Sequence, residues 1–368
     1  MNFTLAGLTT TTTTIDCHQL VSINGTTEMA FVGETPWHHL GQQLPAGCTV
    51  EQMVKAAHME WKIKRSRIRF ADGIGVSADS LHVITDQHVL FREDTKQPLG
   101  IVSDGYRIVQ PAQVIEFFDN LVRSQGYELC TAGVLFGGKK FWALAKVAEG
   151  AVVGKDRIGA YVLLTSSCDG SSATEGRFTA IRVVCNNTFT MATGEKAAAK
   201  ITHRSKFNVA QMQQRMGLVK DSFAAYLEDA RRLAAQRISD RDAAAIVRKL
   251  LRPTEVAAEE AKLEVADAAA VLARISGNTT AMQAGDDKAT RAPKGEAEIL
   301  ALFRGHGHGA QLAGSQGTAW GLLNAVTEYV DHKAQAKSID HRVDRAFFGS
   351  GDELKQSAMT LLKQVAMA

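Results

Sequence analysis

A run of cations near residue 65 is the feature of this sequence with the clearest chemical meaning. Five basic side chains fall within eight residues of a strand-like segment, namely Lys62, Lys64, Arg65, Arg67 and Arg69. Successive side chains of a strand point to opposite faces, so the three arginines would share one face and the two lysines the other. This pattern favours binding to the phosphates of a nucleic acid. It is equally typical of an exposed edge strand whose charges prevent aggregation.

Further basic and amide side chains occur on neighbouring expected strands and turns. They complete the candidate nucleic-acid-binding set, which adds Arg92, Arg107, Lys139, Lys140, Arg177, Arg182, Asn186 and Asn187. Aromatic residues that could stack on bases lie in the same region, namely Trp61, Phe70, Tyr106, Phe141 and Trp142. Phosphate neutralisation combined with stacking is typical of proteins that bind single strands. For the two asparagines, a turn is the simpler interpretation.

A nucleophilic set is the main catalytic alternative. Asp169, Cys185 and His203 are the residue types of a Cys–His–Asp arrangement, which needs an activated thiol and a base within hydrogen-bond reach. Cys185 follows an apolar strand pattern, however, and a buried structural cysteine is usual there. We therefore assign no catalytic residue and keep a Cys/His-dependent hydrolase or nuclease as an alternative.

Histidine-rich motifs raise the question of a metal. The chain contains His38-His39 and His306-Gly307-His308, but no CxxC or HExxH motif accompanies them. Zinc sites normally show such spacing. The sequence thus predicts structural or solvent roles for these histidines, with no metal and no cofactor.

Composition limits the classes of function. The chain has 368 residues, of which 45% are hydrophobic, and a formal net charge of +3, so any affinity for nucleic acid must come from local clustering. Five cysteines, an odd number, argue against a disulfide framework and favour a reduced cytoplasmic setting. No apolar run approaches the ~18 residues of a membrane span, and the N-terminus lacks the features of a secretory signal.

The order of expected elements predicts an α+β fold. Thr49, followed by Gln52 at capping-box spacing, predicts a short helix through about Met59. Strand patterns at 61–70, 82–92 and 100–110 then precede a helix that begins at Pro111. Gly137-Gly138-Lys139 then separates two strand-like runs as in a hairpin. We expect a mainly antiparallel sheet with packed helices and a helical C-terminal half, divided into a flexible Thr-rich arm (1–36), an α+β core (37–204) and a helical domain (205–368).

Helical periodicity dominates the second half. The pattern predicts a long amphipathic helix over 212–233, a helix capped by Ser239, an Ala- and Glu-rich helix over 254–275, and helices near 318–334 and 352–366. Asn324, Glu328 and Asp331 would share one helical face. That face is either a polar site or subunit contact, or a solvated surface.

Several motifs in this order resemble one known family. They are Trp37-His38-His39-Leu40-Gly41, Leu99-Gly100-Ile101-Val102 followed by Tyr106, Ser167-Cys168-Asp169-Gly170, Arg182-Val183-Val184-Cys185-Asn186-Asn187-Thr188, Thr202-His203-Arg204 and Asn324-Ala325-Val326-Thr327-Glu328-Tyr329. Over about residues 30–355 the chain resembles the phage/plasmid-like proteins built on a bacterial domain of unknown function. That family commonly has His-Asp-Gly where this chain has Cys168-Asp169-Gly170. The resemblance implies a mobile-element origin and no established activity.

A fainter similarity suggests a function. The expected order of helix, three strands, helix and hairpin is similar to the annealing core of phage Red beta, RecT and eukaryotic Rad-type proteins, which bind single-stranded DNA in a basic groove and form rings or helical filaments. The resulting hypothesis is a non-catalytic, homo-oligomeric protein that binds and anneals single-stranded DNA in phage or plasmid recombination. An anti-defence protein that binds a host protein through its helical half is a further alternative.

Overall fold

The structure is a computed structural model that describes residues 22–23, 26–33, 41–71, 81–182, 187–190, 198–217, 221–252 and 295–367. Its centre is an eight-stranded sheet with the order β12-β11-β10-β9-β8-β3-β4, in which β13 also pairs with β11. The strands are β3 (Met29–Val32), β4 (Gln42–Leu44), β8 (Glu128–Leu135), β9 (Lys140–Val153), β10 (Asp156–Ser167), β11 (Thr174–Arg182), β12 (Asn187–Thr190) and β13 (Ala198–Ile201). Every pairing in this sheet is antiparallel except that of β3 with β4.

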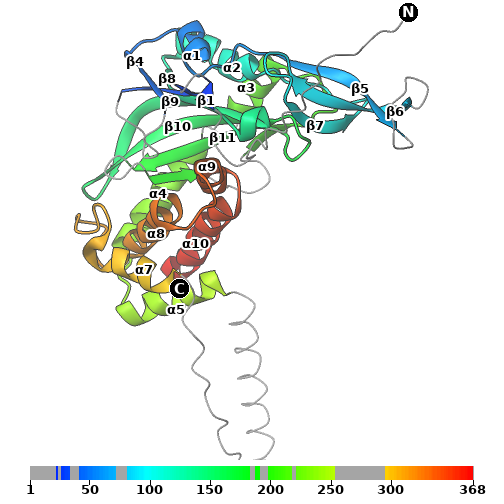
Figure 1. Cartoon of the computed structure of the whole chain (residues 1–368). Coiled ribbons are helices and arrows are strands. Elements are labelled where there is room, and N and C mark those ends of the chain that lie inside the picture. Colours follow the sequence, from blue (N-terminus) through cyan, green and yellow to red (C-terminus); the bar gives the residue numbers. More distant parts are fainter. Residues whose placement is uncertain are drawn as a thin grey trace, which may run out of the picture.

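Helices cover both faces of this sheet (Figure 1). One face carries α1 (Val50–Ala56), α2 (Pro111–Gln125) and α3 (Val209–Gly217). The other carries α4 (Asp221–Ala235), α8 (Ala319–Glu328), α9 (Ile339–Phe347) and α10 (Ser350–Met367), with α5 (Asp240–Leu251) and α7 (Glu296–Ala301) packed on these helices. The expected α+β class, with antiparallel strands and a helical C-terminal region, is confirmed.

Local sequence signals explain where several elements begin and end. Thr49 caps α1 in a capping box with Gln52, as its spacing predicts. Pro111 occupies the first turn of α2, and Gly126 ends that helix in the left-handed conformation at φ 69°. Between β8 and β9 the turn is a 3-10 segment (Phe136–Gly138), as the Gly-Gly-Lys motif indicates.

A second sheet forms a projecting arm. Its three antiparallel strands are β5 (Ile63–Ala71), β6 (Leu81–Arg92) and β7 (Pro98–Ser103), in the order β5-β6-β7. In Figure 1 this sheet extends sideways from the eight-stranded sheet and the helices. Its base is anchored by Ile63, Leu90 and Val102, which are buried in the main hydrophobic core.

The N-terminal segment and the expected boundary at residue 205 differ from the prediction. Residues 28–32 were expected in a flexible arm, but β3 is a buried strand of the large sheet, with Met29 and Ala30 fully buried. Its partner β8 lies about a hundred residues away in the chain, so no local pattern reveals the pairing. A two-stranded pair, β1 (Ser22–Ile23) with β2 (Thr26–Thr27), precedes it. One core cluster runs across the expected boundary at residue 205, from Ala30 to Leu362.

The helical half follows the predicted pattern in part. The expected helix over 212–233 corresponds to α3 and α4, and residues 218–220 between them lie outside the described part. The expected helix over 254–275 also lies outside it. Two π-helical segments, η4 (Leu302–His306) and η5 (Tyr329–Lys333), follow directly after α7 and α8. Among the helices of the described residues, none combines the length and apolar character needed to cross a membrane.

Candidate nucleic-acid interface

The cations on and directly before β5 lie exposed along the arm. Lys62, Lys64, Arg65, Arg67 and Arg69 all have exposed side chains. Two of them form surface ion pairs, Lys64 with Glu93 at 3.3 Å and Arg65 with Asp104 at 3.9 Å. Such pairs are worth about 0–1 kcal/mol, so a phosphate can replace the carboxylate at little cost. Arg67 and Arg69 have no acidic partner among the residues that the structure describes.

A groove opens where the arm meets the body. It has a volume of about 370 Å³ and is lined by Arg65, Tyr106, Arg107, Ile108, Gln113, Lys206 and Phe207. Four parts of the chain supply these residues: β5, the segment between β7 and α2, the first turn of α2, and the segment between β13 and α3. The groove thus combines three cationic side chains with two aromatic rings, Tyr106 and Phe207.

Hydrogen bonds and ring stacking hold the Tyr106-Arg107 segment in place. The Tyr106 hydroxyl donates to the carbonyl of Ser167 at 3.0 Å, and the ring stacks on His203 with centroids 4.5 Å apart. His203 Nδ1 lies 3.0 Å from the carbonyl of Arg107, whose backbone N–H donates to the carbonyl of His203 at 2.6 Å. The backbone of this groove wall is therefore fixed, while the Arg107 side chain remains exposed.

Burial sets the protonation of the two stacked rings. It raises the pKa of Tyr106 well above its ordinary value, so the phenol stays a neutral donor. It lowers the pKa of His203, although the contact with the Arg107 carbonyl opposes this. At neutral pH, His203 is consequently neutral, and Nδ1 donates to the Arg107 carbonyl.

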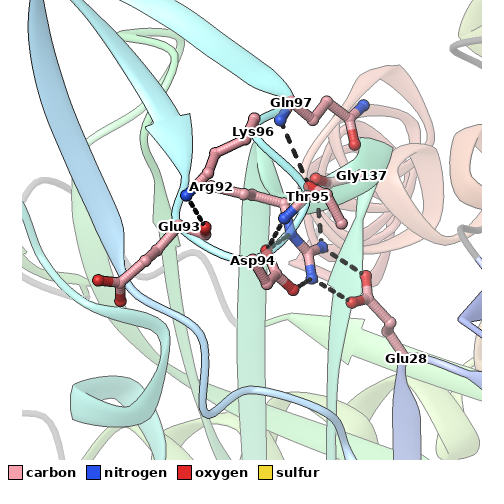
Figure 2. Close-up of polar contacts among 8 residues, drawn as sticks. All are labelled: Glu28, Arg92, Glu93, Asp94, Thr95, Lys96, Gln97 and Gly137. Carbon is pink, nitrogen blue, oxygen red and sulfur yellow. Dashed lines mark hydrogen bonds and ion pairs between the residues drawn. The ribbon is translucent and has the colours of Figure 1, made fainter.

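Arg92 does not belong to this surface, which corrects the sequence-based prediction. Its side chain is fully buried and its guanidinium nitrogens lie 2.7 and 2.9 Å from the Glu28 carboxylate. They also contact Asp94 at 2.8 and 3.0 Å, and the guanidinium lies 4.1 Å from the ring centroid of Trp61. Figure 2 shows the side chain enclosed between Glu28, Asp94 and Gly137. Its hydrogen bonds to Asp94 lower the pKa of that carboxyl. The Arg92 side chain has no exposed surface, so its guanidinium is not available to a phosphate.

Two other predicted cations join the sheet to the helices instead. Lys140 of β9 pairs with Asp344 of α9 at 2.6 Å. Arg177 of β11 contacts Asp352 of α10 at 3.2 Å and its strand neighbour Glu175 at 2.7 Å. Both side chains therefore pair with the helices on the face of the large sheet that carries α9 and α10. Lys139 is half-buried in the β8–β9 turn, and its carbonyl accepts from the backbone N–H of Cys168.

For the three remaining candidates, Arg182, Asn186 and Asn187, the structure describes the backbone alone or nothing. Arg182 ends β11 and pairs with Asn187, the first residue of β12. The side chains of both fall outside the description, as does the whole of Asn186. The structure therefore does not assign these three residues to the groove.

The alternative nucleophilic set is not assembled within the described residues, because Cys185 lies outside them. The cysteine of the Ser-Cys-Asp-Gly motif, Cys168, is buried, and its thiol donates to the carbonyl of Gly138 at 3.1 Å. Burial raises the pKa of this thiol, which makes it a structural group rather than a nucleophile. In the described part of the chain, no three His, Cys, Asp or Glu side chains are grouped as metal ligands.

Lys206 and Phe207 are the cationic and aromatic groove residues that the sequence patterns did not indicate. They follow the Thr-His-Arg motif at a point where the strand pattern ends and the helical pattern begins. The only available signal was two cations, Arg204 and Lys206, within three residues of that junction. Lys206 and Phe207 come close to Arg65, about 140 residues earlier in the chain, only through tertiary packing.

Together, the fold and groove define an α+β protein whose basic three-stranded arm projects from a sheet covered by helices on both faces. Residues 98–347 match the family described as Domain of unknown function (DUF932), and this match covers more than half of the chain. The protein therefore belongs to that family, which confirms the resemblance to a bacterial domain of unknown function. The matched segment includes Tyr106, Arg107, Lys206 and Phe207, and begins after β5 and β6. No curated protein and no solved structure matches the chain.

Proposed function

We propose that this protein binds single-stranded DNA along the exposed face of the arm and through the groove at its base. The observation that carries the proposal is the convergence of Arg65, Arg107 and Lys206 with Tyr106 and Phe207 around one opening. Cations neutralise phosphates and aromatic rings accept bases, which is the combination that single-strand binding requires. The formal net charge of the chain is only +3, so the attraction for phosphate would come from this local cluster rather than from the chain as a whole.

The arm would extend the groove into a longer binding track. Arg67 and Arg69 continue beyond Arg65 along the same face of β5, with side chains exposed. The register shift between Arg67 and Ile68, where β6 has extra residues, lies in the middle of this row. A bulge of this kind increases the twist of the strands. It would turn Arg69, which lies beyond the shift, relative to the groove. Contacts along the strand would then be mostly to phosphate, with little dependence on sequence.

The direct test is fluorescence anisotropy with a labelled oligonucleotide of about 30 nucleotides at 50 and 200 mM salt. We expect binding that weakens steeply with salt, since counterions are released as phosphates are neutralised. The double change Arg67→Gln/Arg69→Gln tests the arm, and Arg107→Gln/Lys206→Gln tests the groove. Each should weaken binding, and each lost phosphate contact should reduce the salt slope by about 0.7.

Arg231→Gln on α4 is a control, because it removes an exposed cation, paired with Glu228, from a helix that lines neither the arm nor the groove. It should leave affinity and salt slope unchanged. No binding at 50 mM salt, or binding insensitive to salt, would refute the proposal. Equal weakening by the control would refute the assignment to the arm and groove. A double-stranded oligonucleotide of the same length tests the preference for single strands.

The same proposal extends to annealing by a homo-oligomer in phage or plasmid recombination. Annealing makes no covalent bond and needs only phosphate neutralisation with bases left free to pair. An oligomer would join several grooves and multiply weak contacts. Mass photometry with and without oligonucleotide, together with fluorescence transfer between complementary strands, tests this extension. A monomer that binds DNA without accelerating annealing would leave the binding proposal and remove the extension.

A further inference from the structure

The groove at the base of the arm holds more positive charge than one internal phosphate of a DNA strand requires. Arg65, Arg107 and Lys206 all line it, and no carboxylate is among the described residues of its wall. An internal phosphodiester carries one negative charge, whereas a phosphate at the end of a strand carries about two at neutral pH. Three cations around one opening therefore match a terminal phosphate better than an internal one.

The side chains of these cations are accessible to a ligand. Arg107 and Lys206 are exposed, and neither has an acidic partner in the part of the chain that the structure describes. The contacts that Arg65 makes with Asp104 are long, 3.9 Å to the carboxylate and 3.5 Å to the backbone carbonyl. Exposed pairs of this kind contribute about 0–1 kcal/mol, so Arg65 can exchange Asp104 for a phosphate.

The size and the walls of the groove suit the last nucleotide of a strand. Its volume of about 370 Å³ lies near the lower end of the range for small-molecule pockets, ~300–1,000 Å³, so it fits one nucleotide better than several. Tyr106 and Phe207 supply rings on which one base can stack. Gln113 brings the first turn of α2 to the groove, and the partial positive charge of a helix N-terminus adds to the attraction for an anion.

We propose that the groove binds the terminal phosphomonoester of a DNA strand, with Arg65, Arg107 and Lys206 around the phosphate. This inference rests on the proposed binding of single-stranded DNA and adds to it a preference for phosphorylated ends. Arg67 and Arg69 lead away from the groove on the same face of β5 as Arg65. A strand held along the arm by these arginines would therefore place its end in the groove.

Three strands of one sequence, about 30 nucleotides long and labelled internally, test the preference by fluorescence anisotropy. One carries a 5′ phosphate, one a 3′ phosphate and one neither. We expect at least one phosphorylated strand to bind about tenfold more tightly than the strand without a terminal phosphate, as a further charge contact near a protein surface allows. The strand that gains affinity identifies the end that is bound. Equal affinity for all three strands would overturn this inference and leave single-strand binding intact, whereas absence of binding to any strand would remove both.

Two sets of variants assign the preference to the groove. Arg107→Gln and Lys206→Gln should each remove most of the preference for the phosphorylated strand. Arg67→Gln/Arg69→Gln on the arm is the matched control, which should weaken the binding of all three strands by a common factor and keep their ratio. Circular dichroism establishes that each variant folds. A full preference in the folded Arg107→Gln variant, or its loss in the arm variant, would overturn the proposal.

A variant that gains affinity completes the test. Asp104→Asn removes the negative charge that lies beside Arg65 and leaves that guanidinium free to bind the phosphate. It should increase the preference for the phosphorylated strand, a result that loss of folding cannot produce. An unchanged or smaller preference in this variant would contradict the role of Arg65.

Discussion

At the residue scale, Arg92 illustrates how an ordinary sequence pattern can hide a buried charge. Its strand alternates and contains other polar residues, so an exposed position was the natural interpretation. The partner that neutralises it, Glu28, lies 64 residues earlier in a segment expected to be flexible. Full burial is possible because Glu28 and Asp94 take up the guanidinium donors and Trp61 covers its plane.

The Arg92–Glu28 ion pair predicts that two glutamates close to Arg92, Glu28 and Glu93, contribute very differently to the free energy of unfolding. Glu28→Gln leaves the buried guanidinium without its bidentate partner and should lower the free energy of unfolding by about 3 kcal/mol. Glu93→Gln removes only the exposed contact with Lys64 and should change it by less than about 0.5 kcal/mol. Urea denaturation of both variants measures the difference, and similar values for the two would contradict the structural role of Arg92.

At the element scale, a buried carboxylate of α9, Asp340, contacts the β8–β9 turn. Asp340 is fully buried, and its Oδ2 accepts from the backbone N–H of Phe136 at 2.6 Å. Burial raises the pKa of Asp340 to about 6, with smaller contributions from Glu28 and Asp344, and the Phe136 contact opposes the shift. The helix therefore packs on the hairpin most stably when this carboxyl carries its proton.

This carboxyl predicts a pH dependence of stability with a definite sign. The unfolded chain releases the proton near pH 3.8 and the folded protein near pH 6, so between these values the folded state holds the extra proton. The stabilising contribution is full below pH 3.8 and is lost as the pH rises through 6, amounting to about 3 kcal/mol. Asp340→Asn should remove this dependence.

Urea denaturation of the two proteins from pH 4.5 to 7.5 measures that contribution. The unfolding free energy of the unchanged protein, minus that of the variant, should fall over this range. A difference that stays constant or rises with pH would show that Asp340 is not the titrating group.

At the scale of the whole molecule, the α+β part and the helical part share one core. Trp320 of α8 donates to the fully buried Asp156 of β10 at 3.1 Å, and the pairs Lys140–Asp344 and Arg177–Asp352 cross the same interface. The core cluster contains α2 residues such as Phe117 and α8 residues such as Leu322. Neither half can bury its apolar face alone.

A truncated chain should show this dependence. We expect a protein of residues 1–204 to lack a cooperative thermal transition, because the sheet face that contacts α4, α8 and α9 would be exposed. The full chain is the control, and far-ultraviolet circular dichroism during heating is the measurement. A sharp transition in the truncated chain would indicate that the helical half is an independent domain.

The sequence by itself determined the elements whose signals are local. The capping box at Thr49, the start of α2 at Pro111 and the Gly-Gly-Lys hairpin all follow from residues a few positions apart, whose backbone preferences act without the rest of the fold. The α+β class follows from the order of those elements.

Only the tertiary structure decided which side chains meet. It buried Arg92 against Glu28, directed Lys140 and Arg177 toward the helices, and gathered Arg65, Arg107 and Lys206 around one groove. The same packing joined His308 to Glu328. Each of these contacts links residues from separate elements, and their energies depend on burial and on the partner's position, neither of which a local sequence pattern contains.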